Sequence, residues 1–443
     1  MARAVIPHVQ LNLFPAGAVA PTPGNMSLTN GRANKLSVSD RAFHDWYRFV
    51  LSYPPHLVRE YIAKFAVPSG QMVLDPFCGT GTTLIEAKIL GINSIGIEAN
   101  PMAHFASSVK TNWKINPDGL REHAGCVAEQ AENSLVKTSV LRTLPYEQHA
   151  LLLKDSISPR PLHKALVLLE TLRNQSGSTY MNHELLAFAK ALIASSNLHF
   201  GPEVGVTKQK KEDAPLIEYW MQEILNMSED LRSANVNKAF SKVICADARQ
   251  MDSILTERSI DAVFTSPPYP NEKDYSRTTR LESVILGFVQ DRAGLKTLKK
   301  NLLRSNTRNV YKGDDDERWV EHNASVQTLA AQIEQRRIDL GKTSGFERLY
   351  GKVTKLYFGG MARHLAELKD FLKPGAYLGY VVGDQASYFQ VMIRTGQILA
   401  EIAESLGYKV MDIVLFRTRL ATATKQQMRE EVVVLQWPGK ERG

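Results

Sequence analysis

Residues 71–101 have the sequence QMVLDPFCGTGTTLIEAKILGINSIGIEANP, which alternates a strand, a glycine turn, a helix and a second strand. Such a βαβ unit places its second strand parallel to the first. Gly79 and Gly81 stand in the turn, where glycine lets the backbone bend sharply and approach a ligand closely. The exposed amides of the following helix favour an electron-rich or anionic group. The stretch therefore predicts an α/β fold with a ligand site at this turn.

The turn differs from two common phosphate-binding loops. No Gly-Lys-Ser/Thr follows it, as a P-loop requires, and Leu84 stands where a dinucleotide-binding loop has its third glycine. A nucleoside with a small zwitterionic tail is therefore a better ligand than a pyrophosphate. We expect Glu98, at the tip of the second strand, to accept both ribose hydroxyls, Asp75 to face a cationic amino group, and Asp247 to bind an adenine amine. Each of these residues also has a purely structural alternative. Asp75 could be an ordinary turn residue, and Glu98 and Asp247 could be ordinary helix caps.

The composition indicates a soluble protein with a well-packed core. The chain has 443 residues, of which 44% are hydrophobic and 23% charged, and no apolar run approaches the ~20 residues that span a bilayer. We expect no membrane segment and no signal peptide. The three cysteines are widely spaced, which favours a reduced, cytoplasmic setting without a structural metal. The net charge of +8 favours a polyanionic partner such as a nucleic acid.

Strand and helix signals continue along the chain. Helical periodicity dominates residues 102–235, and strand signals return at 241–247 and 259–266. The last two strands, 409–417 and 430–437, are joined without a convincing crossover helix, which allows an antiparallel hairpin at the sheet edge, although residues 423–431 also suit a helical turn. We divide the chain into a flexible N-terminal arm (1–40), a first half of the sheet domain (41–115), a helical insertion (116–239), a middle part (240–290), a basic helical insertion (291–352) and a C-terminal half (353–443).

A rigid polar loop, TSPPY (265–269), follows the apolar strand SIDAVF. Each proline lacks an amide donor, so this segment cannot continue a helix or lie inside a central strand. The carboxyl ends of neighbouring parallel strands lie at one edge of a sheet, so the loop is expected to lie beside the glycine turn.

With these residues the chain resembles the amino-group DNA methyltransferases, which use S-adenosylmethionine to methylate N4 of cytosine or N6 of adenine. DPFCGTG looks like their cofactor loop, GIEANP like their ribose-binding strand end, and TSPPY like their catalytic loop. Residues 43–62 resemble the segment that closes over the methionine end of the cofactor. The resemblance implies a Rossmann-like class I methyltransferase fold: a mostly parallel seven-stranded sheet with an antiparallel edge hairpin, plus a helical insertion. The cofactor-binding residues that it implies are Asp75, Phe77, Gly79, Gly81, Glu98, Asp247 and Tyr53.

The catalytic loop has groups that could activate an exocyclic amine. Such an amine is a poor nucleophile, because its lone pair is delocalised into the base. The Ser266 side chain and the Pro267 carbonyl are expected to accept the amine hydrogens, with Pro267 and Pro268 keeping the loop rigid. Tyr269 would stack on a base that has been flipped out of double-stranded DNA. The chemistry needs no metal, and the absence of cysteine from the loop argues against methylation at carbon 5 of cytosine.

Ser before Pro-Pro is typical of the N4-cytosine enzymes and Asp of the N6-adenine enzymes, so Ser266 favours cytosine. Many N4-cytosine members carry the catalytic loop first, whereas this chain has the cofactor loop first, so adenine stays open. The rival functions are an RNA guanosine-N2 methyltransferase, a protein glutamine methyltransferase and a non-catalytic DNA-binding relic. A restriction or defence setting, with partner proteins from such a system, fits the preferred function.

Two basic segments are candidates for contact with DNA. The helical insertion, our candidate for target recognition, contains a Gly-bearing loop with three lysines, and the basic insertion has cations three and four residues apart, so that several share a helical face. A solvated helix face is the alternative. The candidate DNA-binding residues are Lys208, Lys210, Lys211, Lys273, Arg277, Lys299, Lys300, Arg304 and Arg308.

Overall fold

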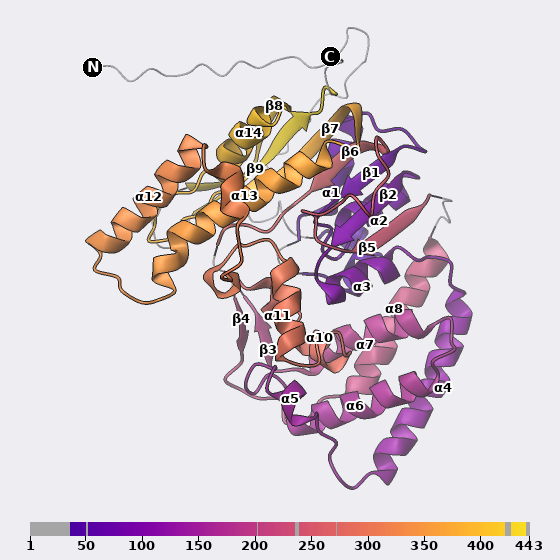
Figure 1. Ribbon diagram of the computed structural model, residues 1–443. Coiled ribbons are helices and arrows are strands. Elements are labelled where there is room, and N and C mark those ends of the chain that lie inside the picture. The colour runs from indigo at the N-terminus through magenta and orange to yellow at the C-terminus, as the bar shows by residue number, and fades with distance from the viewer. Residues whose placement is uncertain are drawn as a thin grey trace, which may run out of the picture.

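Seven strands form one sheet in the spatial order β5-β2-β1-β6-β7-β9-β8 (Figure 1). The computed structural model describes residues 36–49, 52–201, 203–234, 239–271, 273–420 and 427–439. Strand β9 runs antiparallel to β7 and β8, and the other neighbouring strands of the sheet are parallel. The strands are β1 (Met72–Asp75), β2 (Asn93–Glu98), β5 (Ser241–Cys245), β6 (Ile260–Thr265), β7 (Leu372–Gly383), β8 (Lys409–Leu420) and β9 (Gln427–Gln436). This arrangement confirms the predicted class I methyltransferase fold, including the antiparallel edge pair.

The strands alternate their side chains between two apolar layers, as the period of two of a strand requires. Val73, Phe264 and Val381 pack against α1 (Pro55–Lys64) on one face of the sheet. Their neighbours in sequence, such as Leu74 and Val263, pack on the other face with α13 (Tyr350–Leu368) and α14 (Thr395–Ser405). The remaining helices of the sheet domain are α2 (Thr82–Ile89) and α3 (Pro101–Lys110).

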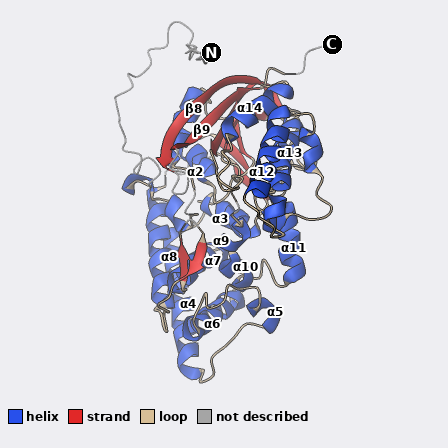
Figure 2. Ribbon diagram, turned by 90° about the vertical axis from the view of Figure 1, so that its left-hand side faces the viewer, coloured by secondary structure: helices blue, strands red, loops and turns tan. Residues whose placement is uncertain are grey.

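The first insertion is a helical layer next to α3, below the sheet in the view of Figure 1 (Figures 1 and 2). Its helices share one apolar cluster, which contains Leu168, Phe188 and Trp220 and extends to Phe43 and Trp46 of the N-terminal segment. The elements are α4 (Pro117–Lys137), α5 (Tyr146–His149), α6 (Pro159–Asn174), α7 (Met181–Ser195), β3 (Leu198–Phe200), β4 (Val204–Val206) and α8 (Leu216–Ser233). Strands β3 and β4 form an antiparallel hairpin, where the sequence had suggested a Gly-containing loop.

The second insertion packs closely on α13. A Cβ atom at Gly359 would lie 2.0 Å from the carbonyl oxygen of Asp316, so only glycine permits this approach of helix α13 to the segment η4. The elements before α13 are α9 (Tyr275–Thr278), α10 (Arg280–Ile285), α11 (Arg292–Asn301), η3 (Thr307–Asn309), η4 (Asp316–Val320), α12 (Ala324–Asp339) and η5 (Glu347–Leu349).

Two short 3-10 helices, η1 (Val38–Asp40) and η2 (His44–Trp46), precede α1. Most of the proposed N-terminal arm, residues 1–35, lies outside the described residues. Within the described part of the chain, no helix has both the length and the apolar character needed to cross a bilayer.

Candidate active site

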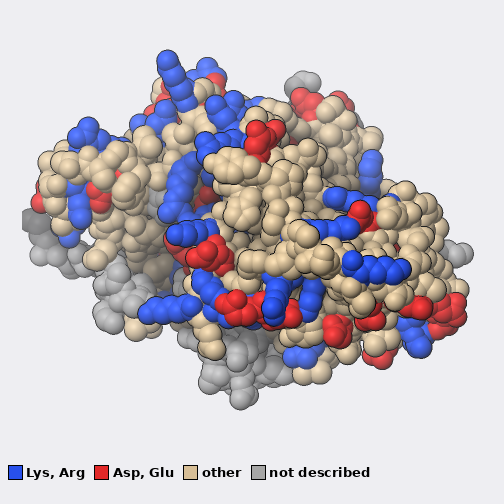
Figure 3. Space-filling view, turned by 90° about the horizontal axis from the view of Figure 1, so that it is seen from below, with Lys and Arg blue, Asp and Glu red and all other residues tan. Residues whose placement is uncertain are grey.

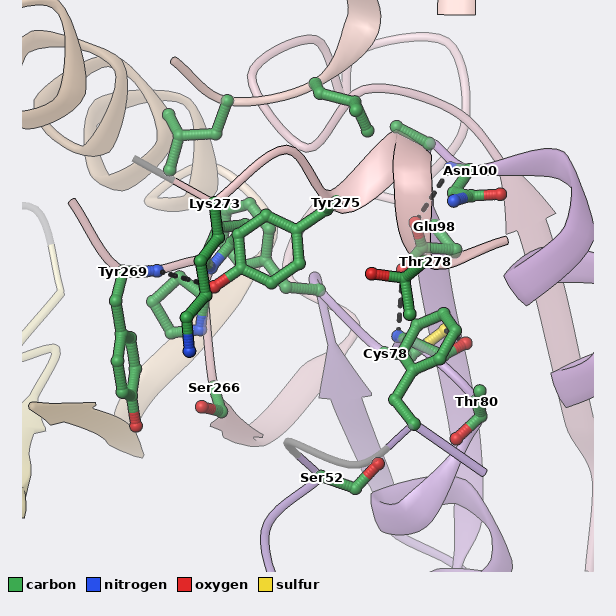
Figure 4. A pocket seen from close by; sticks show the side chains of 18 of the residues that line it. Ser52, Cys78, Thr80, Glu98, Asn100, Ser266, Tyr269, Lys273, Tyr275 and Thr278 are labelled. Atoms are coloured by element: carbon green, nitrogen blue, oxygen red, sulfur yellow. Dashed lines mark hydrogen bonds between the residues drawn. The ribbon is translucent and has the colours of Figure 1, made fainter. Parts of the chain in front are cut away.

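A cavity of about 490 Å³ opens at the carboxyl ends of β1, β2, β5 and β6. Residues of the cofactor loop (76–80) line it together with residues 266–269 of the catalytic loop, so the structure brings the two sequence motifs to one site. Figure 4 shows the two halves of the cavity: Ser266, Tyr269, Lys273 and Tyr275 on one side, and Cys78, Thr80, Glu98 and Asn100 on the other.

The cofactor loop turns through two glycines with positive φ. Gly79 has φ of 50° and Gly81, the residue before α2, has φ of 87°. At Gly81 a Cβ atom would also lie 3.0 Å from Cβ of Ser107 in α3, so a larger residue would be both strained and crowded. The buried Thr80 Oγ1, in the lining of the cavity, has no hydrogen-bond partner among the described residues. The loop thus offers an unsatisfied polar atom next to a helix N-terminus.

Glu98 ends strand β2 and faces the cofactor loop. Its Oε2 accepts the Gly79 amide at 2.8 Å and its Oε1 accepts the Asn100 amide at 2.7 Å. Burial raises the pKa of the Glu98 carboxyl to about 7, although these two backbone hydrogen bonds act in the opposite direction. Each carboxyl oxygen has a second lone pair, so a carboxylate at this position can still accept hydroxyl groups from a ligand.

Asp75 lies beneath the cavity, where it is fully buried, and not in the cavity lining. Its Oδ1 accepts Thr265 Oγ1 at 2.6 Å, and its Oδ2 accepts the hydroxyl of Tyr53 at 2.8 Å. The Phe77 amide donates to Oδ1 at 3.2 Å. This placement does not match our expectation that Asp75 faces a cationic amino group, because the chain's own donors surround the carboxyl. The side chain instead ties the cofactor loop to the catalytic strand and to the segment before α1.

Tyr53 and Phe77 both line the cavity. The hydroxyl of Tyr53 is committed to Asp75 and Thr83, so its ring is what faces the cavity. The ring of Phe77 meets His364 edge-on, with 4.9 Å between the ring centroids. Burial lowers the pKa of His364 to about 4, so this imidazole is neutral at physiological pH and packs as a neutral ring behind Phe77.

Asp247 lines the cavity beyond β5, but Arg249 already binds its carboxylate. Arg249 Nε lies 2.9 Å from Oδ1 and Nη2 lies 2.6 Å from Oδ2. The same guanidinium binds Asp316 Oδ2 at 2.5 Å, and both side chains of that second pair are about 7% exposed. We did not predict Arg249 from the sequence, although it stands only two residues after Asp247.

The catalytic loop is fixed by two hydrogen bonds. Ser266 Oγ donates to the carbonyl of Val381 in β7 at 3.0 Å, and the Tyr269 amide donates to the hydroxyl of Tyr275 at 3.4 Å. The Tyr269 ring lies over Gly383, where an added Cβ would be 3.0 Å from the ring. Because the Ser266 hydroxyl has given its hydrogen to Val381, its oxygen presents lone pairs to any further partner.

Of the predicted DNA-binding residues, Lys273, Arg277 and Arg308 line the cavity. Arg304 is 4% exposed and paired with Asp314 at 2.8 Å, and Lys299 is paired with Asp274 at 2.8 Å, so both side chains are engaged within the protein and their contact with DNA stays a prediction. Both stand in a basic run, but their acidic partners lie outside it and meet them only in the fold.

The other predicted cations lie outside the cavity lining. Lys208, Lys211 and Lys300 are exposed, whereas Lys210 is partly covered and lies 3.8 Å from Asp155. Figure 3 shows Lys and Arg side chains beside Asp and Glu over the face seen from below, so this face is not one continuous basic surface. The sequence analysis missed Arg417, Arg419 and Glu430 of the edge hairpin, and Phe200 and Val204 of the β3–β4 hairpin, all of which line the cavity.

No group of three or more His, Cys, Asp or Glu side chains in the described part of the chain is arranged to hold a metal ion. The three cysteines are free, with Cys78 buried and Cys126 and Cys245 exposed. Metal-free chemistry therefore stays a prediction.

The strand order and the cavity at its carboxyl edge define the class of protein as a class I methyltransferase. Residues 30–107 match a family model of N6- and N4-methyltransferases described as "DNA methylase". The Type II methyltransferase M.BsoBI of Geobacillus stearothermophilus is 25% identical over 91% of this chain and 85% of its own length. The Type II methyltransferase M.AvaI of a Nostoc species is 24% identical over 86% of this chain and 82% of its own.

This family model and these relatives, each aligned over more than four fifths of both chains, support the resemblance to the amino-group DNA methyltransferases. An archaeal tRNA (guanine(10)-N2)-dimethyltransferase, from Methanothermobacter thermautotrophicus, is 43% identical, but over only 11% of this chain. The solved structure of TrmN from Thermus thermophilus aligns with 86% of this chain and 48% of its own, at a TM-score of 0.27 and 10% identity. This similarity is too low to inform the fold. The fold assignment rests on the strand order instead.

Proposed function

We propose that the protein is a site-specific DNA methyltransferase that transfers a methyl group from S-adenosylmethionine to N4 of a flipped-out cytosine. A single observation carries the proposal: Ser266 Oγ, in the cavity that the cofactor loop also lines, donates its hydrogen to Val381 at 3.0 Å. The neutral oxygen is thereby fixed as an acceptor for an amine hydrogen. The named relatives are Type II methyltransferases, which supports a restriction-modification or defence setting, and a cytoplasmic location stays a prediction.

The fixed acceptor addresses the difficulty of this reaction. The exocyclic amine of cytosine is a weak nucleophile, because its lone pair is shared with the ring. An oxygen that accepts one amine hydrogen holds the nitrogen in place and favours a tetrahedral geometry, without reorganisation during the reaction. The Ser266 oxygen meets this need, and we assign the second acceptor to the Pro267 carbonyl. Pro267 and Pro268 restrict the backbone that carries both groups.

The family implies S-adenosylmethionine as cofactor, and the residues at the cofactor loop fit it. Glu98 would accept the ribose hydroxyls, and the unpartnered Thr80 Oγ1 offers a further polar contact near Gly79 and Gly81. The rings of Tyr53 and Phe77 give apolar contact, and Asp247 keeps acceptor capacity beside Arg249 for an adenine amine. When bound, this cofactor supplies an activated methyl group on a sulfonium centre.

The cations at the cavity support DNA as the polyanion. Lys273, Arg277 and Arg308 line the cavity, and the buried Nε of Arg277 has no hydrogen-bond partner among the described residues. Such residues position a phosphate backbone without sequence information. We assign target recognition to the helical insertion (116–239), whose hairpin β3–β4 reaches the cavity, and backbone contact to the basic insertion (291–352). Flipping the base would cost a few kcal/mol.

The proposal is tested by incubating the protein with labelled S-adenosylmethionine and duplex DNA, RNA or protein, followed by digestion and identification of the methylated species. We expect N4-methylcytosine in DNA. Label only in RNA or protein would refute a DNA enzyme, and N6-methyladenine would replace the cytosine assignment with its main alternative. Ser266→Ala should lower the rate of transfer roughly 10²- to 10³-fold, the usual loss for one catalytic hydrogen-bonding group, with cofactor affinity unchanged. Lost cofactor binding would mean that the role of Ser266 is misassigned.

A further inference from the structure

Three residues in a row across the sheet edge lie beside the catalytic loop. Gly383 of β7 pairs with Glu430 of β9, and Glu430 pairs with Arg417 of β8. The Tyr269 ring lies over Gly383, and a Cβ added to that glycine would meet the ring at 3.0 Å and Glu430 Cγ at 3.2 Å. Gly383 and Arg417 are two strand spacings apart, about 10 Å. This distance is comparable to the width that a nucleic-acid base occupies.

Arg417 is held by Glu430, and among the described residues the ends of its guanidinium have no hydrogen-bond partner. Its Nε donates to Glu430 Oε2 at 2.6 Å, and the two side chains are 19% and 11% exposed. Nη1 and Nη2 make no hydrogen bond to another residue in the described parts of the chain, and Arg417 lines the cavity. Arg417 therefore keeps donor groups beyond its pair with Glu430, on a side chain that lines the cavity.

Its neighbour Arg419 has a different environment. The Arg419 side chain is 44% exposed and lies 3.7 Å from Glu430, and its Nη2 is 3.4 Å from the carbonyl of Asp384. Arg419 therefore resembles a surface cation at the edge of the cavity, whereas Arg417 is an oriented donor. The two residues carry the same charge on the same strand and form a matched pair for experiment.

Both members of the Arg417–Glu430 pair act on the catalytic tyrosine. The pKa of the Tyr269 phenol is raised by burial and by Glu430, whereas a side-chain hydrogen bond with Ser266 and, to a smaller extent, the charge of Arg417 oppose this rise. Ser266 is hydrogen-bonded to Val381, two residues before Gly383 on the same strand. The amine acceptor, the stacking ring and the guanidinium are thus gathered around one end of the cavity.

The chemistry of this arrangement suits one base. Cytosine carries the acceptors N3 and O2 next to its amine, and guanine pairs with it by placing two N–H donors on N3 and O2 and an acceptor on the amine. A guanidinium offers two parallel N–H donors. On its Watson–Crick edge adenine has a single acceptor, N1, beside its amine, and a C–H group at position 2.

We propose that Arg417, oriented by Glu430, recognises the target base by donating from Nη1 and Nη2 to N3 and O2 of cytosine, while Ser266 accepts from N4. This inference rests on the proposed function. With adenine in the cavity, one of the two Arg417 N–H donors is left without a partner. This should disfavour adenine by roughly 5- to 150-fold, which is the range for an unpaired buried group or for the loss of one good bidentate contact.

The test begins by mapping the methylated position for the wild-type protein. Duplexes with cytosine or adenine at that position are then compared by kcat/KM for wild type, Arg417→Met and the control Arg419→Met. We expect Arg417→Met to lower kcat/KM for cytosine roughly 10- to 100-fold and to reduce the preference over adenine by a similar factor, at unchanged cofactor affinity. Arg419→Met should alter both substrates alike and leave their ratio within about threefold, as expected for a phosphate contact.

Two further variants guard against a merely structural effect. Glu430→Gln keeps an acceptor for Arg417 Nε but loosens the pair, so it should reduce the preference less than Arg417→Met. If Arg417→Met melts at a clearly lower temperature than wild type, Arg417→Lys, which keeps the charge but not the parallel donors, takes its place. Methylated DNA with an unchanged base preference in these variants would refute the role of Arg417 alone. No label in DNA from the wild type would refute the proposed function and this inference together.

Discussion

The strongest test of the cofactor half of the site is the pH dependence of Glu98. Burial raises the pKa of this carboxyl from 4.5 to about 7 in the free protein. Ribose hydroxyls donate hydrogen bonds, so a cofactor bound through them selects the ionised carboxylate. The ionised fraction is about 10% at pH 6 and about 90% at pH 8 for a group with this pKa. The affinity for S-adenosylmethionine should therefore be about tenfold lower at pH 6 than at pH 8, a difference of about 1.4 kcal/mol.

The variant Glu98→Gln cannot ionise, so it should lose this pH dependence. Titrations of the cofactor's own groups are common to both proteins and cancel in the comparison. At pH 8 the variant should bind about 10- to 150-fold more weakly, since hydrogen bonds to a charged acceptor contribute about 1.5–3 kcal/mol. Folding stability should depend on pH in the opposite direction to cofactor binding. The raised pKa of the Glu98 carboxyl stabilises the free protein below pH 4.5, and this contribution is lost as the pH rises through 7.

The assay is isothermal titration calorimetry at pH 6, 7 and 8, in two buffers of different ionisation enthalpy. At pH 7 the wild type should release about half a proton more than Glu98→Gln on binding the cofactor. Parallel pH profiles for the two proteins, or equal proton release, would refute the assignment of Glu98 to the ribose.

Two further predictions concern the supports of the site. Arg249→Met should destabilise the protein by about 3–5 kcal/mol in urea unfolding, because it leaves the buried Asp316 carboxylate with only the longer contact to Arg363 at 3.4 Å. As a control, Arg318→Ala removes a pair whose side chains are 73% and 55% exposed and should cost less than about 1 kcal/mol; equal effects would contradict the importance of burial. Gly383→Ala should displace the Tyr269 ring, 3.0 Å from the new methyl group, and lower kcat about tenfold at unchanged cofactor affinity. An unchanged kcat would show that the position of this ring does not matter.

The sequence predicted those features that depend on local order along the chain. The run from Met72 to Glu98 carries its own strand, turn and helix signals, and TSPPY must leave a strand because of its prolines. The meeting of both motifs followed from the parallel order alone. These signals were enough for the fold and for the location of the cavity.

The features that were missed depend on contacts distant in sequence. Asp75 has the position of a ligand residue, but Tyr53 and Thr265, 22 residues before and 190 after it, occupy its carboxyl. Arg304 belongs to a basic run, but Asp314 folds back on it. The three-residue strands β3 and β4 are too short to show alternation. Arg417 reaches the cavity because β9 lies between β7 and β8, an order that local periodicity does not encode.

Both insertions contribute to the cavity that the cofactor loop and the catalytic loop define. The hairpin β3–β4 of the first insertion provides Phe200 and Val204, and the end of α11 in the second provides Asn301 and its neighbours. Arg249 links the second insertion to the cofactor half, because its guanidinium binds both Asp247 and Asp316. A sheet edge alone would leave the catalytic loop open to water on these sides. Both insertions thus complete the wall of the cavity, so under the proposed function changes in them should affect methyl transfer as well as DNA binding.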